Sequence, residues 1–149
     1  MITIETERLI GKSELEIVDG KVCLQEKHNK GFDLLNCRPA TGMEQGFAFY
    51  LKGKPGIEVC HIGITYARNK FEISYGTDRK ELRHCGYMTE AVGGFLEWLF
   101  SDTEENEVWG FVPINNEPSK SVLLNNSFIA DEIEGSTRWF IRRRGEKNG

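Results

Sequence analysis

The sequence predicts one α+β domain (α/β in the broad sense), built on a mixed, mostly antiparallel sheet with flanking helices. Three observations support this prediction. The chain has 149 residues and 39% hydrophobic side chains, which suits a single domain with one core. Turn signals separate short apolar segments, and the apolar spacing changes from strand-like to helix-like in the second half. Strands before, between and after the helical segments favour a mixed sheet. Because the length suits one domain and no long linker is evident, we assign residues 1–149 to one domain.

The amino-terminal half is expected to consist mainly of strands. Residues 2–10 are predicted to form a strand, and Asp19-Gly20 between apolar residues predicts a hairpin turn. The rest of residues 11–45 carries loop signals and no clear pattern. An antiparallel meander of three strands is expected next, at residues 47–51, 57–66 and 70–75.

A helix is predicted after this meander, because apolar residues from Met88 to Leu99 recur at intervals of three and four. Gly93 and Gly94 lie inside it, and each costs about 1 kcal/mol relative to alanine. Either another segment approaches the helix closely at these glycines, or the helix is weaker than its pattern suggests.

The carboxyl-terminal part is predicted to hold a strand, a short helix and a strand pair. Residues 107–112 form the strand, and the helix starts near Pro118, since proline suits the first helical position, and runs to about Asn126. The last two strands are expected at residues 128–134 and 137–143.

Composition excludes several classes of protein. The formal net charge of −4 makes nucleic acid an unlikely partner, although a local anion site stays possible. No apolar run is long enough to span a membrane and the start does not resemble a signal peptide, so we expect a cytoplasmic protein. The four cysteines lack any Cys-x-x-Cys spacing, which favours reduced thiols and no metal site. The aromatic side chains are expected in the core, and the basic end at 142–144 and Lys147 as a solvated end.

The most informative segment runs from Arg83 to Ala91, where a glycine-containing loop leads directly into the predicted helix. The start of a helix presents backbone N–H groups without internal partners, and the helix dipole adds positive potential there. Gly86 lets a ligand approach the chain closely, and basic residues such as Arg79 and Arg83 lie nearby. These features suit a pyrophosphate, although the motif alone is more typical of an ordinary strand-to-helix loop.

Several motifs together carry a family resemblance. They are Glu5-Thr6-Glu7-Arg8-Leu9, Glu72-Ile73-Ser74-Tyr75, Gly86-Tyr87-Met88-Thr89-Glu90-Ala91, and Asn116-x-x-Ser119-x-x-Val122-Leu123 followed by Ser127-Phe128. In this order the chain resembles the GNAT superfamily of acetyl-CoA-dependent N-acyltransferases, in particular the branch of ribosomal-protein N-terminal acetyltransferases. It departs from the family pattern at Met88, where a small residue is usual, and at Ser74 and Ser127, where glycine is usual. Residues 11–45 are also short for the family's usual pair of amino-terminal helices.

The resemblance implies the GNAT fold, in which the fourth and fifth strands splay apart and the pantetheine arm of acetyl-CoA lies between them. Backbone groups around residues 74–77 would pair with that arm, Asn116 would contact it, and the amides of residues 84–89 would hold the pyrophosphate. The implied cofactor-binding residues are Tyr75, Gly76, Thr77, Arg83, His84, Cys85, Gly86, Tyr87, Met88, Thr89, Asn116 and Ser119.

The expected reaction is attack of an amine on the acetyl thioester, with Glu72, Tyr75 and Ser119 as the candidate catalytic residues and Glu58 as an alternative base. Most amines are protonated at neutral pH, so a carboxylate must accept a proton, directly or through water. Glu72 is the first candidate and Glu58 the second. A backbone N–H near Tyr75 would stabilise the oxyanion, and the resemblance implies that Ser119 donates to the departing thiolate.

We therefore expect an N-acetyltransferase that uses acetyl-CoA, needs no metal, and acts on a primary amine of a protein N-terminus or small molecule. The alternative is a CoA-binding sensor or interaction module of the same fold without catalysis. An unrelated mixed-sheet protein is a further alternative. The chain is expected to be a monomer or a homodimer.

Overall fold

The computed structural model describes residues 1–24, 45–67, 69–77 and 79–145. Cys37 and most of the pattern-poor region 11–45 lie outside the described residues, as does Lys147. The elements are β1 (Ile2–Glu5), β2 (Leu9–Ser13), β3 (Glu16–Val18), β4 (Lys21–Cys23), β5 (Gly46–Leu51), β6 (Lys54–Ala67), β7 (Lys70–Gly76), η3 (Lys80–Leu82), α2 (Tyr87–Asp102), β8 (Glu107–Pro113), α3 (Glu117–Asn125), β9 (Ile129–Glu134) and β10 (Thr137–Arg143).

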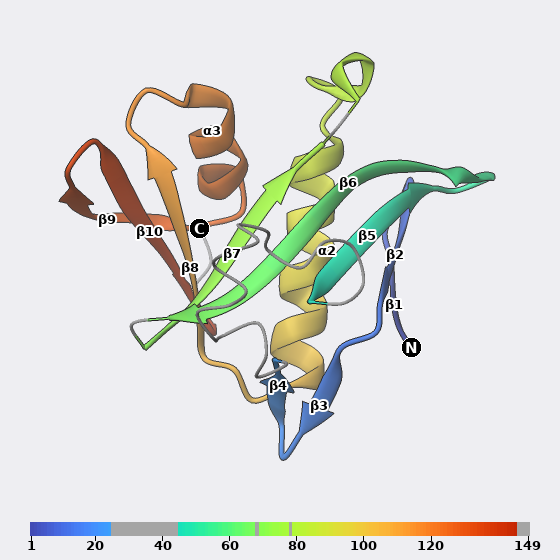
Figure 1. The fold of residues 1–149 in the computed structure, drawn as a ribbon, viewed down its shortest axis with the longest axis horizontal. Helices are drawn as coiled ribbons and strands as arrows, with labels where there is room; N and C mark the ends of the chain where they lie inside the picture. Colours follow the sequence, from blue (N-terminus) through green and yellow to red (C-terminus); the bar gives the residue numbers. More distant parts are fainter. Residues whose placement is uncertain (25–44, 68, 78, 146–149) are drawn as a thin grey trace, which may run out of the picture.

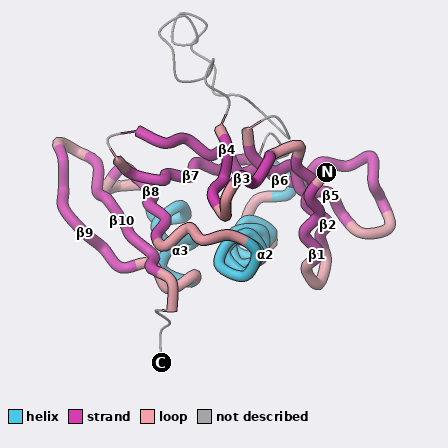
Figure 2. Tube along the Cα trace, turned by 90° about the horizontal axis from the view of Figure 1, so that it is seen from below, coloured by secondary structure: helices cyan, strands magenta, loops and turns pink. Residues whose placement is uncertain are grey.

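A mixed sheet organises the molecule, as predicted. Its strands lie in the order β1-β2-β5-β6-β7-β8-β10-β9, and every neighbouring pair is antiparallel except β7 with β8. The sheet curves around α2 and α3, which lie side by side in its hollow (Figure 2). The core fills the space between the sheet and these helices, with Phe47, Phe95 and Leu123 among its fully buried side chains.

The parallel pair β7 and β8 separates along its length, which confirms the predicted splay. Glu72 opposite Trp109 is the one registered pair that joins these strands among the described residues. Beyond it the two strands diverge, and α3 and η3 lie at the open end (Figure 1). Within the described part of the chain, the edge of β7 that faces β8 therefore has no strand partner at residues 74–76, the positions where an extended ligand is expected to pair.

The strand predicted at residues 2–10 is wrong, because two antiparallel strands occupy this region. Thr6 closes the turn between β1 and β2: its N–H donates to the Leu9 carbonyl at 2.9 Å, and its hydroxyl accepts the Leu9 N–H at 3.1 Å. The hairpin predicted at Asp19-Gly20 is confirmed as β3 and β4. Both turn residues have positive φ, 51° and 80°, as a tight turn between twisted strands requires.

The two glycines inside α2 lie where other segments approach the helix closely. A Cβ on Gly94 would lie 2.5 Å from Cγ2 of Thr6 and 3.2 Å from Cγ2 of Ile4. A Cβ on Gly93 would lie 3.0 Å from Oδ1 of Asn126. The glycines therefore permit close approach by the β1–β2 turn on one side and by the end of α3 on the other.

The basic carboxyl-terminal segment is only in part the solvated end that we expected, because Arg143 and Arg144 are exposed but Arg142 is buried. Arg142 is 7% exposed and donates to the carbonyl of Asn126. Arg144 donates to the carbonyls of Phe100, Thr103 and Glu105, the last two at 2.8 and 2.6 Å. The carboxyl end of α2 leaves carbonyls without helical partners, and Arg144 satisfies them.

Candidate functional site

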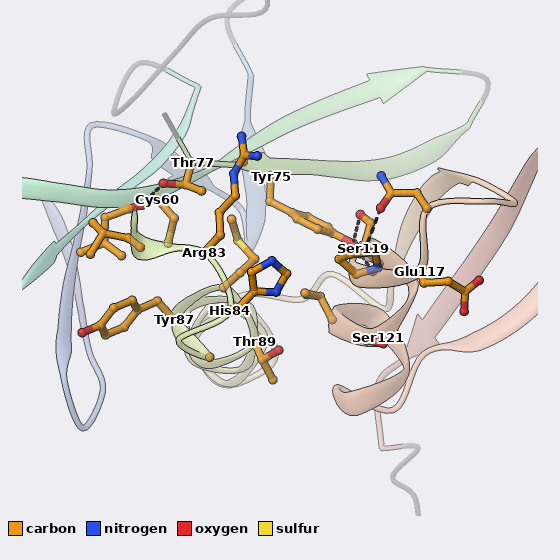
Figure 3. Close-up of a pocket in the computed structure, with 18 residues that line it drawn as sticks. Cys60, Tyr75, Thr77, Arg83, His84, Tyr87, Thr89, Glu117, Ser119 and Ser121 are labelled. Carbon is orange, nitrogen blue, oxygen red and sulfur yellow. Dashed lines mark hydrogen bonds between the residues drawn. The ribbon is translucent and has the colours of Figure 1, made fainter. Parts of the chain in front are cut away.

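A cavity of about 890 Å³ lies where the end of β7 and the middle of β6, at Val59 and Cys60, meet the starts of α2 and α3. Tyr75 faces it from β7, Ser119 from the start of α3 and Thr89 from the start of α2 (Figure 3). Its lining residues are Val59, Cys60, Tyr75, Gly76, Thr77, Leu82, Arg83, His84, Gly86, Tyr87, Met88, Thr89, Asn116, Glu117, Pro118, Ser119, Ser121 and Val122. It is therefore a mixed apolar and polar groove that ends at the start of a long helix.

The amino end of α2 supplies anion-binding groups to this cavity. The first hydrogen bond of the helix runs from the Glu90 N–H to the Gly86 carbonyl at 3.1 Å, so the amides of Tyr87, Met88 and Thr89 precede the helical ladder. The N-cap is Gly86, at φ 81° and ψ 2°, which has no side chain to cap them. Because these donors line the cavity beside Arg83, this end suits a phosphate group.

A network of hydrogen bonds to the Glu90 carboxylate holds this helix start, and no local sequence signal predicted it. The Glu90 carboxylate accepts from the Thr6 hydroxyl at 2.5 Å and from the Arg8 N–H and Nε at 2.7 Å each. Burial alone would raise the pKa of Glu90, but these hydrogen bonds and the charge of Arg8 outweigh it and lower the pKa. The amino-terminal motif and the helix motif thus meet in space.

The start of α3 is closed by its own residue, in contrast to α2. Oδ1 of Asn116 accepts the N–H of Ser119 at 3.2 Å and caps the helix. The side-chain amide nitrogen of Asn116 still has donors for a ligand. Asn116 therefore combines a structural role with the cofactor contact that the resemblance implies.

Tyr75 and Ser119 form a hydrogen-bonded pair across the gap between β7 and α3 (Figure 3). The Tyr75 hydroxyl donates to the Ser119 carbonyl at 2.9 Å, and the Ser119 hydroxyl donates to the Tyr75 oxygen at 3.2 Å. Burial raises the pKa of Tyr75 more than the hydrogen bond to Ser119 lowers it, so the pKa is about 12. Tyr75 is therefore neutral at physiological pH, and the Ser119 hydroxyl donates its proton to the Tyr75 oxygen.

A second, smaller cavity of about 130 Å³ opens between β7 and β8. It is lined by Glu72, Ile73, Ser74, Tyr75, Phe111, Val112 and Ser119. Tyr75 and Ser119 line both cavities, so the two spaces meet at this pair. A ligand in the large cavity and one in the small cavity would both contact this pair, and Glu72 lines the small cavity.

Most of the site residues named from the sequence lie together, with three qualifications. Cys85 does not line the large cavity, whereas Cys60, which we did not select, does. The Thr77 hydroxyl donates to the Val59 carbonyl at 2.6 Å and is thus used within the protein. Glu58, the second candidate base, lines neither cavity. Burial raises the pKa of Cys60 to about 12, which keeps its thiol protonated.

Among the described residues, no group of three or more His, Cys, Asp or Glu side chains is arranged to hold a metal ion. Within the same ranges, no helix has the length and apolar character needed to cross a membrane.

Comparisons with known proteins identify relatives of this chain. Residues 24–129 match the family model described as an acetyltransferase (GNAT) domain. No curated protein sequence matches significantly. Among solved structures, the chain is similar to a GNAT-family acetyltransferase from Bacillus anthracis, with a TM-score of 0.70 and 16% identity over 97% of this chain and 100% of that one.

Two other similar structures carry more specific names. Ribosomal-protein-S5-alanine acetyltransferase from Vibrio fischeri gives a TM-score of 0.61 and 13% identity over 100% of both chains. RimJ from Mycobacterium smegmatis, solved with CoA-disulfide, gives a TM-score of 0.54 and 20% identity over 66% of this chain and 52% of that one. At these identities the likeness shows a shared fold.

Proposed function

The chain belongs to the GNAT acetyltransferase family, whose members use acetyl-CoA, and from this premise we propose that it transfers the acetyl group to a primary amine of a protein N-terminus or small molecule. One observation carries the proposal. The large and small cavities meet at Tyr75 and Ser119, in the gap where β7 and β8 separate. This arrangement offers one compartment for the acetyl donor and another for the acceptor.

The residues of the large cavity fit acetyl-CoA by their chemistry. The amides at the start of α2, with Arg83 beside them, suit the pyrophosphate. Apolar side chains such as Leu82 and Val122 suit the aliphatic parts of the pantetheine arm. The open edge of β7 and the Asn116 amide group suit its peptide-like groups, since an exposed strand edge pairs readily with an extended chain.

Acetyl-CoA supplies an activated thioester, and the protein must manage the protons of the transfer. The acceptor ammonium first loses one proton and becomes a nucleophilic amine. A carbon–nitrogen bond then forms, the carbon–sulfur bond breaks, a second proton leaves nitrogen and one proton reaches sulfur. Glu72 lines the acceptor cavity and is proposed to take the first proton, directly or through water. The Ser119 hydroxyl is proposed to donate to sulfur, rotating away from Tyr75 as negative charge develops.

The nature of the acceptor rests on the motifs and on the names of similar structures. The amino-terminal and α2 motifs resemble the branch that acetylates ribosomal proteins, and one similar structure is named as an S5-alanine acetyltransferase. We propose a protein N-terminus as the first acceptor to test. A small-molecule amine is the second, because an aminoglycoside acetyltransferase is also similar in fold.

The test is turnover with a panel of amines. Peptides with different amino-terminal residues, an aminoglycoside, a polyamine and free amino acids are each mixed with acetyl-CoA and the protein. Release of the CoA thiol is followed by a colorimetric thiol reagent, and the acetylated product is identified by mass spectrometry. Turnover with one class of amine supports the proposal and names the acceptor. Binding of acetyl-CoA without turnover of any amine would favour the CoA-binding module without catalysis.

A further inference from the structure

We propose that Arg8 is a positioning residue that directs the pyrophosphate-binding loop toward acetyl-CoA without itself touching it. This inference rests on the proposed function, because it assumes that the loop at the start of α2 binds the pyrophosphate. Arg8 lies in the turn between β1 and β2, outside the residues that line the cavity, and its side chain is 41% exposed.

Arg8 contacts the loop at successive residues. Its Nη1 donates to the carbonyl of Cys85 at 3.0 Å, and its guanidinium lies 4.3 Å from the centre of the Tyr87 ring. Its Nη2 lies 3.4 Å from the position that a Cβ on Gly86 would take. One side chain therefore covers the back of the turn that leads into α2.

The contact with Cys85 fixes the direction of a peptide group. In a planar trans peptide the carbonyl and the following N–H point in opposite directions. Because the Cys85 carbonyl points at Arg8, the N–H of Gly86 points away from Arg8. Gly86 lines the cavity and Arg8 does not, so this hydrogen bond turns the Gly86 donor toward the ligand side.

Glu90 holds Arg8 in this position. Its carboxylate accepts from both the backbone N–H and Nε of Arg8 at 2.7 Å, while Nη1 remains for Cys85. The Glu90 carboxylate and the Cys85 carbonyl thus accept from two different nitrogens of the same planar guanidinium. A lysine ammonium is a single point donor on a flexible stem and does not reproduce this geometry.

The experiment compares two acetyl donors in wild type, Arg8→Ala and Arg8→Lys. Acetyl-CoA carries the pyrophosphate, and acetyl-pantetheine lacks it. The Kd of acetyl-CoA, from calorimetry, is expected to rise about tenfold or more in both variants, since an anion loses a directed charge-assisted hydrogen bond. The kcat/KM for acetyl-pantetheine is expected to stay within about twofold of wild type, because that donor does not use the loop.

The matched control is Lys52→Ala, which removes a cation paired with Glu5 at 2.8 Å in the same strand region but without contact to the loop. It is expected to leave both donors unaffected. Wild-type affinity for acetyl-CoA in Arg8→Ala overturns the inference. Wild-type affinity in Arg8→Lys with loss in Arg8→Ala also overturns it, because the charge alone would then act. If Arg8→Ala does not fold, the Arg8→Lys result decides. Failure of the wild-type protein to bind acetyl-CoA would instead refute the proposed function.

Discussion

Two substitutions of Asn116 are predicted to distinguish its role in folding stability from its role in ligand binding. The structure gives its side chain two ends: Oδ1 caps α3 by accepting the Ser119 N–H at 3.2 Å, and the amide nitrogen is proposed to contact the pantetheine arm. Asn116→Ala removes both. Loss of the cap costs about 1 kcal/mol of folding free energy, or about 3 °C in Tm for a chain of this size. Loss of one neutral hydrogen bond raises the Kd of acetyl-CoA about fivefold.

Asn116→Ser separates the two effects. Serine is as good an N-cap as asparagine, so Tm is expected to stay within about 1 °C of wild type. Serine does not extend an amide to the ligand, so the Kd is expected to rise as in Asn116→Ala. The KM for acetyl-CoA should rise with little change in kcat, because the contact exists before and during the reaction. Thermal unfolding by circular dichroism and calorimetry measure the two quantities. Wild-type affinity in Asn116→Ser would refute the proposed ligand contact.

Three further predictions use other features of the site. Gly86 and Gly53 both have φ of 81°, so Gly86→Ala and Gly53→Ala are each expected to lower the free energy of unfolding in urea by about 1–2 kcal/mol. Acetyl-CoA should still raise the Tm of Gly53→Ala but not that of Gly86→Ala. Iodoacetamide should modify exposed Cys85 before buried Cys60, and acetyl-CoA should slow the reaction at Cys85 because its neighbours His84 and Gly86 line the cavity, as peptide mass spectrometry would show. The pKa of Tyr75 is raised to about 12, so folding stability should fall as pH rises from about 10 to about 12, and Tyr75→Phe should remove that part of the fall in pH-dependent denaturation.

Local patterns predicted the elements whose signals are themselves local. The helix from Tyr87 to Asp102 follows from its apolar spacing, and the β3–β4 hairpin follows from Asp19-Gly20. The turn between β1 and β2 was missed because it contains neither glycine nor proline. It depends on the Thr6 hydroxyl and on Glu90, 84 residues away, and no local pattern reports such a contact.

The same distinction applies to the site. The loop around Gly86 and the start of α3 were found because each is one continuous motif. The smaller cavity was not, because Glu72 and Phe111 meet only after β7 and β8 pack. Ser127, a departure from the family's glycine, has φ 66°, so this position does adopt the backbone conformation that glycine favours. A departure from the motif therefore marks a real backbone requirement that serine meets with some strain.

The central claim is that acetyl transfer takes place at the Tyr75–Ser119 pair, and the kinetics of Ser119→Ala test it most directly. This variant keeps the Ser119 carbonyl that accepts from Tyr75, so the pair's backbone link and the binding of acetyl-CoA should survive. A hydroxyl that helps only as charge develops on sulfur shows its effect in kcat. With the best amine of the panel, kcat is expected to fall about ten- to a hundredfold, within the range for positioned proton transfer, while the Kd of acetyl-CoA stays within twofold. Full wild-type kcat in Ser119→Ala would contradict the account.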